Sequence, residues 1–512
     1  MTCARVGNLV IMEFVEKIKN TTSPILQKMK RGVEPVENFV KKFMYTDYYI
    51  WFILAIVFIG WVTKCAPFGF IALILVSSFV LLFADDLLPL LTNIFGAVLM
   101  IYTDTIEEFL YLWPVFIPLG IAIAVFVVRN VKLKKEIPDN KFRLGKMFFP
   151  QLAVSIALLI GGADVVSAEG YLVALPNTLF LGVGVLAVYV LARNFIRRDT
   201  QIDHTTYVAK MMAYIGMVVA LQLVIAIGRS GAAPVQWSSA YWDIGWGNRN
   251  NVATYFLFTA PMCLYLFTKH RYGVVYLLMG IVQYCCLILT FSRGGILFGM
   301  IAAVVGIMLA VYKARDRKRQ IGYIAVVVGL MVLFYLIFMD EVNDVIRGLL
   351  GRGTGLSGRD LLYAEAWELF KAKPFLGHGL GYMGNGPGGV HEAIKIYWFH
   401  STLFQVIACM GIVGILAYGY NYVVKGILIF KNWRNGFNLF VAVAFLGFEG
   451  YSMMDTGTMV PFPNMMIVIL LMCVIEMFTS NTDSVTFDRL ASKEIYVRET
   501  RPLEAKDAEV AE

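Results

Sequence analysis

Long apolar runs separated by short polar connections make up most of the 512-residue chain. A helix needs roughly 20 apolar residues to cross a bilayer, and these runs have that length, whereas membrane β-barrel strands alternate over about ten residues. The pattern therefore predicts an all-α, polytopic membrane protein with about 12 to 14 transmembrane helices.

A long polar interruption at residues 340–397 divides the chain into five expected parts. These are a basic amphipathic segment at 1–46, transmembrane helices at 47–339, a large external loop at 340–397, transmembrane helices at 398–479 and a charged tail at 480–512. A loop this long between apolar helices is usually functional. For residues 1–46, a partly disordered basic tail is as good an interpretation as a helix on the inner membrane surface.

Composition and charge agree with a membrane protein. Hydrophobic residues make up 59% of the chain, charged residues 16%, and the mean hydropathy is +0.69. The net charge of +8 does not indicate nucleic acid, because the basic residues form short clusters, such as Lys425, Lys431 and Arg434, on one side of an alternating arrangement. The positive-inside rule makes that side the cytoplasm, so both termini are expected inside and residues 340–397 outside. The seven cysteines have no CxxC spacing, and we expect neither disulfides nor a metal from them.

Arginines on the outer side need another explanation, because orientation does not require them. The four are Arg229, Arg249, Arg293 and Arg359. A charge at the centre of a membrane helix costs roughly 2.5 to 3.5 kcal/mol on insertion scales, which makes function the first hypothesis. The alternative is that each one anchors at the interface or pairs with Glu449 or Asp455.

Arg359 lies at the start of a predicted surface helix. Ser357 is followed three residues later by Asp360, a helix-start signal, and the run at 361–370 is too short to span a membrane. A helix N-terminus beside a guanidinium group favours an anion, and phosphate is the natural candidate.

Three of the five histidines lie in or next to the 340–397 loop. His378 and His391 belong to a glycine-rich stretch and are interpreted as residues at the rim of a site. His400 lies at the outer mouth of the following helix, where a fixed imidazole could act as a general base. The alternative is an interfacial polar cap beside Tyr397 and Trp398.

These residues resemble the bacterial O-antigen ligase and O-antigen polymerase superfamily of membrane glycosyltransferases. The resemblance covers roughly residues 245–420. It rests on Ser292-Arg293-Gly294-Gly295, on Gly358-Arg359 with the later Pro374 and Gly377-His378-Gly379-Leu380-Gly381, and on His400-Ser401 before Gly411-Ile412-Val413-Gly414. His378 within the glycine run and the number of expected helices depart from the family pattern.

The resemblance implies an inverting, metal-independent transfer of glycan from an undecaprenyl-diphosphate carrier to a sugar hydroxyl, on the outer face of the bacterial cytoplasmic membrane. Arg249 and Arg293 would bind the diphosphate with Arg359 as a third contact, and His400 would take the proton from the attacking hydroxyl. Arginines can stabilise a diphosphate leaving group without a cation, and the predicted outer loops contain no DxD pair, so we expect no metal and no cofactor. Glu449 and Asp455 would orient His400 or pair with an arginine.

The sequence leaves the acceptor and one other function class open. A ligase transfers to a lipid-A core and a polymerase to another lipid-linked chain, and we favour the polymerase because both types of bacterial envelope use one. Chain-length or assembly proteins are candidate partners. A polysaccharide flippase or other transporter remains the alternative, although we find no repeated halves in the sequence.

Overall fold

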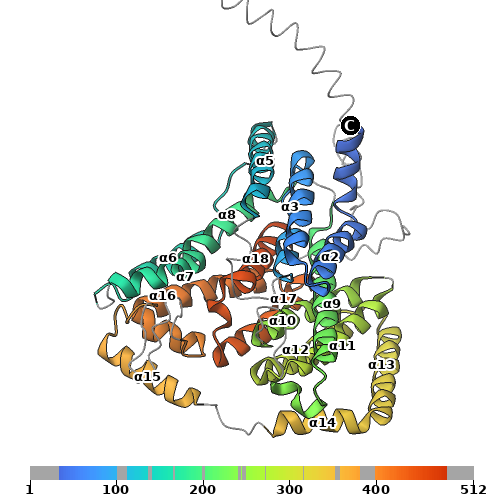
Figure 1. Cartoon of the computed structure of the whole chain (residues 1–512). Helices are drawn as coiled ribbons and strands as arrows, with labels where there is room; N and C mark the ends of the chain where they lie inside the picture. Colours follow the sequence, from blue (N-terminus) through green and yellow to red (C-terminus); the bar gives the residue numbers. More distant parts are fainter. Residues whose placement is uncertain are drawn as a thin grey trace, which may run out of the picture.

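The computed structural model describes residues 34–100, 112–136, 141–164, 168–198, 202–239, 244, 249–270, 272–314, 316–351, 358–380 and 398–480. Every multi-residue element in these ranges is a helix (Figure 1). The α-helices are α2 Asp47–Val62, α3 Ala66–Phe83, α4 Leu90–Val98, α5 Phe116–Glu136, α6 Phe148–Ile160, α7 Ala168–Leu179, α8 Val185–Phe195, α9 His204–Ser230, α10 Arg249–Lys269, α11 Gly273–Leu289, α12 Arg293–Lys313, α13 Arg317–Ile337, α14 Met339–Leu350, α15 Arg359–Ala372, α16 Thr402–Lys431, α17 Gly436–Met454 and α18 Met466–Phe478. Short 3-10 or π-helical turns include η3 Phe180–Gly184, η4 Pro234–Ser239, η6 Gly457–Met459 and η7 Pro461–Met465.

The expected all-α, polytopic class is confirmed. Among the described residues, nine helices are long and apolar enough to cross a membrane, or ten if the bent pair Glu34–Phe43 and Asp47–Val62 is one span. Three shorter apolar helices, Phe148–Ile160, Gly273–Leu289 and Phe462–Phe478, accompany them. The expected 12 to 14 spans are reached only if these shorter helices also cross.

The core of the bundle is built around α10, which packs against α9, α11, α12 and α17 (Figure 1). Its bulky side chains, among them Tyr255, Phe256 and Phe258, are almost completely buried. Within this core the Thr259 hydroxyl donates to the Gln283 side chain at 2.7 Å. By contrast, α13 at the edge of the bundle is mostly exposed and apolar, as expected of a helix that faces lipid.

The candidate arginines and the lysines lie at opposite ends of helices α10 and α12. Both α10 and α12 begin at a candidate arginine, Arg249 and Arg293, and end at a lysine, Lys269 and Lys313. Lys313 donates to the Arg434 carbonyl at 2.7 Å, at the lysine end of the bundle. The arginine ends and the lysine ends of these two helices are therefore on opposite sides of the bundle, and the expected cytoplasmic position of the lysine ends stays a prediction.

Helix α16 is interrupted at Gly411, which has φ 57° and ψ −146°. The chain after α15 packs into the break: the amides of His378 and Gly379 donate to the carbonyls of Ala408 and Cys409, both at 2.8 Å, and the Ile412 amide donates to Pro374 at 2.8 Å. These bonds satisfy backbone groups that a broken membrane helix would leave without partners. A Cβ on Gly411 would lie 2.4 Å from the Pro374 oxygen, so only glycine fits here.

Several sequence predictions need correction or fall outside the described residues. The helix predicted at 361–370 is confirmed as α15, and its position along the outer membrane surface stays a prediction. Its N-cap is Gly358 at φ 77°, without a side-chain cap bond, so the helix starts one residue later than the Ser357 signal predicted. Lys425 lies inside α16, not in an inner connection. The 340–397 loop contains α14, whose apolar face packs on η4. The tail at 480–512 (apart from its first residue), residues 1–33 and His391 lie outside the described ranges.

Candidate active site

His400 sits on a strained turn that ends where α16 begins. Its φ is 49°, a left-handed conformation that costs a non-glycine residue free energy and tends to occur at functional sites. The turn is fixed by the Phe399 amide, which donates to Gln405 Oε1 at 2.9 Å, and by the Tyr363 hydroxyl, which donates to the His400 carbonyl at 3.1 Å. The imidazole side chain is 41% exposed, so a substrate could reach it.

Asp455 orients the imidazole. Its Oδ1 lies 3.2 Å from His400 Nδ1. A carboxylate only accepts hydrogen bonds, so Nδ1 carries the hydrogen and Nε2 of the neutral ring is left to accept a proton. Asp455 caps the end of α17, and its backbone carbonyl accepts the Thr402 amide at 3.2 Å, which ties the two turns together.

The carboxylate of Asp455 remains ionised. Burial by itself would raise its pKa, but the hydrogen bond from His400 and the positive charge of Arg359 outweigh burial, so the pKa lies below its usual value. The stability that this carboxylate contributes is therefore present above about pH 3.9, the pKa of an unfolded Asp, and is lost as the pH falls through the lower folded pKa.

Arg359 and Asn250 hold the other carboxylate oxygen. Asn250 Nδ2 donates to Asp455 Oδ2 at 2.7 Å, and an Arg359 Nη lies 3.4 Å from the same oxygen. The second Nη of Arg359 donates to the Met454 carbonyl. The first turns of α10 and α15 therefore meet at the end of α17.

Arg249 and Arg293 are the first residues of helices that pack against this cluster. Arg249 precedes Asn250 on α10. Arg293 is exposed and starts α12 after a three-residue turn, which Phe291 makes possible by adopting φ 54°. A Cβ on Gly294 would lie 3.4 Å from the Tyr451 ring and 3.5 Å from Met454 Cβ, which places the start of α12 beside the end of α17.

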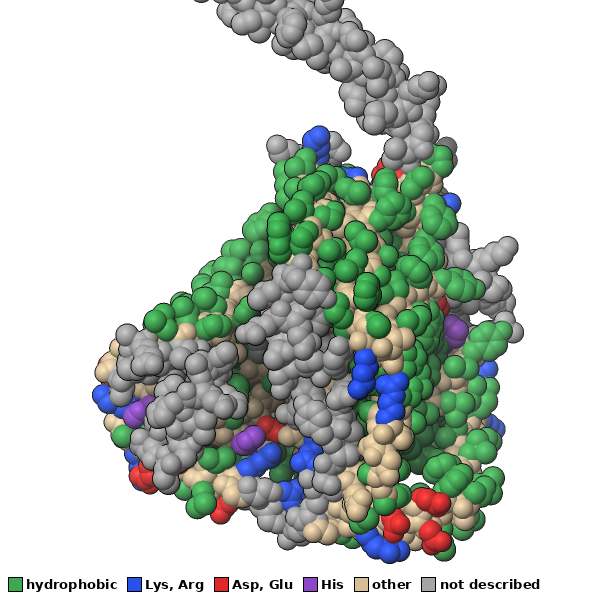
Figure 2. Space-filling view, in the orientation of Figure 1, with side chains coloured by type: hydrophobic (Ala, Val, Ile, Leu, Met, Phe, Trp, Pro, Cys, Tyr) green, Lys and Arg blue, Asp and Glu red, His purple; other side chains and the backbone are tan. Residues whose placement is uncertain are grey.

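Four helix N-termini thus converge near Asp455, those of α10, α12, α15 and α16. Each carries partial positive charge, and three of them begin with an arginine. Figure 2 shows basic, acidic and histidine side chains gathered on the lower part of this face, below a surface that is mostly hydrophobic. Such an arrangement can hold an anion with two phosphates and place a base beside it.

Two of the expected supporting residues lie elsewhere. Glu449 accepts from Lys425 Nζ and from the Tyr422 hydroxyl, each at 2.9 Å, so its partners are on α16 and not His400. His378 Nε2 lies 3.2 Å from the Leu369 carbonyl. Leu369 is ten residues after Arg359 on α15, about 15 Å along the helix axis, so His378 is at the far end of that helix.

Arg229 is also separate from the other three arginines. It lies in the last turn of α9, donates to the Val62 carbonyl at 2.8 Å, and its guanidinium lies 5.5 Å from the centre of the Trp61 ring. These contacts with the end of α2 support the alternative interpretation of Arg229 as an interfacial anchor.

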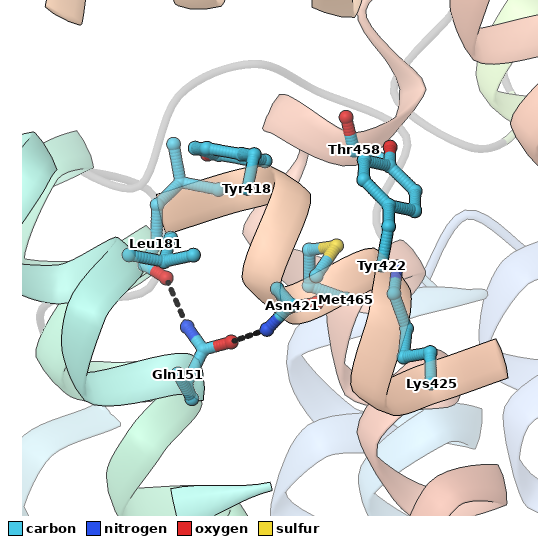
Figure 3. Close-up of a pocket in the computed structure, with 9 residues that line it drawn as sticks. Gln151, Leu181, Tyr418, Asn421, Tyr422, Lys425, Thr458 and Met465 are labelled. Carbon is cyan, nitrogen blue, oxygen red and sulfur yellow. Dashed lines mark hydrogen bonds between the residues drawn. The ribbon is translucent and has the colours of Figure 1, made fainter. Parts of the chain in front are cut away.

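A small cavity lies inside the bundle, apart from the arginines. Its volume is about 10 Å³, enough for one water molecule, and Figure 3 shows Gln151, Asn421, Tyr422 and Lys425 around it. Asn421 donates to Gln151 Oε1 at 3.3 Å. The cavity is too small to hold a sugar.

Sequence reasoning missed Asn250 and Tyr363. Asn250 directly follows Arg249, and Tyr363 is four residues after Arg359, so it lies on the same face of α15. The four-residue spacing from Arg359 could have identified Tyr363. Nothing in the sequence links Asn250 to Asp455, which is 205 positions away.

Comparisons with known proteins agree with the resemblance. Residues 274–419 match the family model described as O-antigen ligase. A relative is the exopolysaccharide production protein ExoQ of Rhizobium meliloti (strain 1021), which is 27% identical over 152 residues, 27% of this chain and 34% of that protein. The chain thus spans about a third of the length of this relative. The resemblance to the O-antigen ligase and polymerase superfamily is confirmed over this central region, which includes Arg293, Arg359 and His400.

Proposed function

From the O-antigen ligase match at residues 274–419, we propose that this chain is a membrane glycosyltransferase that ligates or polymerises surface polysaccharide. Its donor is a glycan on undecaprenyl diphosphate, and its acceptor is a sugar hydroxyl at the outer face of the cytoplasmic membrane. The observation that carries the proposal is the His400–Asp455 pair, surrounded by the helix starts that bear Arg249, Arg293 and Arg359.

Each group has a step in the proposed reaction. Nε2 of His400 takes the proton of the acceptor hydroxyl, and the hydroxyl oxygen attacks the anomeric carbon of the donor sugar. The bond from that carbon to the diphosphate breaks, and its electron pair leaves with the diphosphate. The arginines stabilise the charge that develops there without a metal ion. One displacement, with attack opposite the leaving group, inverts the configuration of the sugar.

An apolar groove on α12 supports a lipid-linked donor. The groove is shallow and open, because all the residues that line it belong to this one helix: Ile296, Leu297, Met300, Ile301, Val304 and Val305. Leu297, Met300 and Val304 follow Arg293 at helical spacing, so the groove continues along the same face of α12. A diphosphate at Arg293 would place the start of an isoprenoid chain on this surface.

Replacing Leu297 and Met300 by Trp fills this groove. We expect the KM for a long-chain donor to rise about tenfold, the effect of losing burial of about two CH₂ groups, while the KM for a short-prenyl donor stays the same. Val326→Trp, at an exposed position on α13, is the matched control. An equal effect on both donors would show that the groove does not bind the isoprenoid chain.

Transfer by the purified protein in lipid vesicles tests the proposed function. With undecaprenyl-diphosphate-linked glycan on the accessible face, we expect free undecaprenyl diphosphate and an extended glycan to form together, at the same rate with and without EDTA. A flippase would move the donor across the bilayer without breaking the bond to diphosphate. Translocation without release of undecaprenyl diphosphate would therefore favour the transporter.

The same assay distinguishes the two acceptors. The match to a protein named for exopolysaccharide production supports polymerisation. We therefore expect lipid-linked glycan alone to give longer chains, whereas a ligase would need lipid-A core as a second substrate.

A further inference from the structure

Tyr363 connects α15 to the backbone of His400. Its hydroxyl donates to the His400 carbonyl at 3.1 Å, and its ring stacks on Phe404 with 4.3 Å between ring centres and 9° between ring planes. The stack on Phe404 fixes the orientation of the Tyr363 ring, and this orientation directs the hydroxyl toward the His400 carbonyl. Tyr363 also lies one turn after Arg359, which contacts Asp455, so one face of α15 reaches both members of the proposed base pair.

The contact with Tyr363 falls where the chain is strained. His400 adopts φ 49°, and a histidine relaxes from this conformation unless neighbouring groups hold it. On one side the Gln405 side chain holds the Phe399 amide, and on the other the Asp455 carbonyl holds the Thr402 amide. Tyr363 holds the His400 carbonyl itself, from a different helix.

The helix that carries Tyr363 is fixed at both ends. At its start, Arg359 donates to the Met454 carbonyl. Beyond its end, the amides of His378 and Gly379 pair with the break in α16. A hydrogen bond from a helix held in this way can set the position of a side chain within a fraction of an ångström.

Tyr363 can donate over the whole neutral pH range. Burial, the largest influence, raises the pKa of its hydroxyl, so the group keeps its proton.

We propose that Tyr363 is a positioning residue, which holds the strained backbone of His400 so that its imidazole stays against Asp455 and faces the acceptor. The proposal rests on the proposed function, because it assigns Tyr363 to the proton-transfer step. Tyr363 does not bind the donor in this role, so it affects the rate of transfer and not the affinity for the diphosphate.

Tyr363→Phe tests the proposal, because it removes the hydroxyl and keeps the stack on Phe404. We expect kcat to fall about tenfold, the rate effect of losing one well-placed hydrogen bond, with the donor KM unchanged. Trp367→Phe is the matched control: it removes a polar hydrogen from a half-exposed aromatic residue one turn further along α15 and should leave kcat and KM unchanged.

A second variant separates positioning from general stability. Phe404→Leu removes the stacking partner and keeps the Tyr363 hydroxyl. If Tyr363 only stabilised the fold, Tyr363→Phe and Phe404→Leu would lose kcat in proportion to their losses in Tm. We expect the loss in kcat for each degree lost in Tm to be larger for Tyr363→Phe than for Phe404→Leu. The same ratio of kcat loss to Tm loss in both variants would overturn the proposal.

His400→Ala, assayed alongside, separates this inference from the proposed function. Loss of transfer in His400→Ala together with full kcat in Tyr363→Phe would overturn only the positioning role. A rise in donor KM with unchanged kcat in Tyr363→Phe would also overturn it, because that result indicates donor binding. Full activity in His400→Ala would overturn the proposed function and the role of Tyr363 with it.

Discussion

His400→Ala should lower the rate of glycan transfer about 10²- to 10⁴-fold, the usual contribution of a general base. The imidazole of His400 is the group placed to take the acceptor proton, because Asp455 holds its Nδ1 and the His400 side chain is partly exposed. Asp455→Asn should give a smaller loss, since the amide keeps a similar shape but lacks the charge that stabilises an imidazolium ion. The measurement is turnover of lipid-linked donor in vesicles, with donor binding followed separately.

His378→Ala is the matched control for the loss of an imidazole. His378 also lies after α15, but its Nε2 contacts the Leu369 carbonyl at the far end of that helix. We expect this variant to keep most of the wild-type rate. A larger loss in His378→Ala than in His400→Ala would mean that the base has been assigned to the wrong histidine.

Arg293→Ala should reduce kcat about 10²- to 10³-fold, as removal of one donor from a developing anion does in other enzymes. Arg293 starts α12 beside the end of α17, where the diphosphate is proposed to lie. Arg293→Lys should recover only part of the rate, because an ammonium group cannot bind two phosphate oxygens as a planar fork does. The measurement is kcat and donor KM in the same vesicle assay.

Arg229→Ala controls for the loss of an arginine near the membrane surface. Its guanidinium contacts Val62 and Trp61 at the end of α2, away from the contacts of Asp455. We expect little change in transfer and a small loss of stability. Equal loss of activity in Arg229→Ala and Arg293→Ala would argue against a diphosphate site at the start of α12.

The sequence predicted where helices occur better than it predicted interruptions within them. Apolar run length identified the membrane helices, and the 361–370 run identified α15, because both depend on local hydrophobic pattern. It did not reveal the interruption of α16, since Gly411 lies in a continuous apolar run and its conformation depends on pairing with the segment after Pro374. It also placed Lys425 in a connection, because a buried lysine is unexpected until its partner Glu449 is known.

For the candidate site, too, the sequence identified individual residues but not all of the contacts between them. The arginines and His400 could be selected from the sequence, because a charge at the membrane boundary is costly and therefore informative. The sequence left two roles open for both Glu449 and Asp455. In the structure Asp455 contacts His400 and Arg359, whereas Glu449 pairs with Lys425.

The sequence by itself determined that this chain is an α-helical membrane protein. It also identified cationic residues near the polar region at 340–397, where placing a charge at the membrane costs free energy. Apolar length and charge are properties of each segment, so no neighbour is needed to read them. The tertiary structure decided which of those residues meet: three of the four arginines start helices that pack around the end of α17, and Asn250 and Tyr363 join them. At this site helix packing brings together Asn250 and Asp455, which are 205 positions apart, and local pattern carries no information about such contacts.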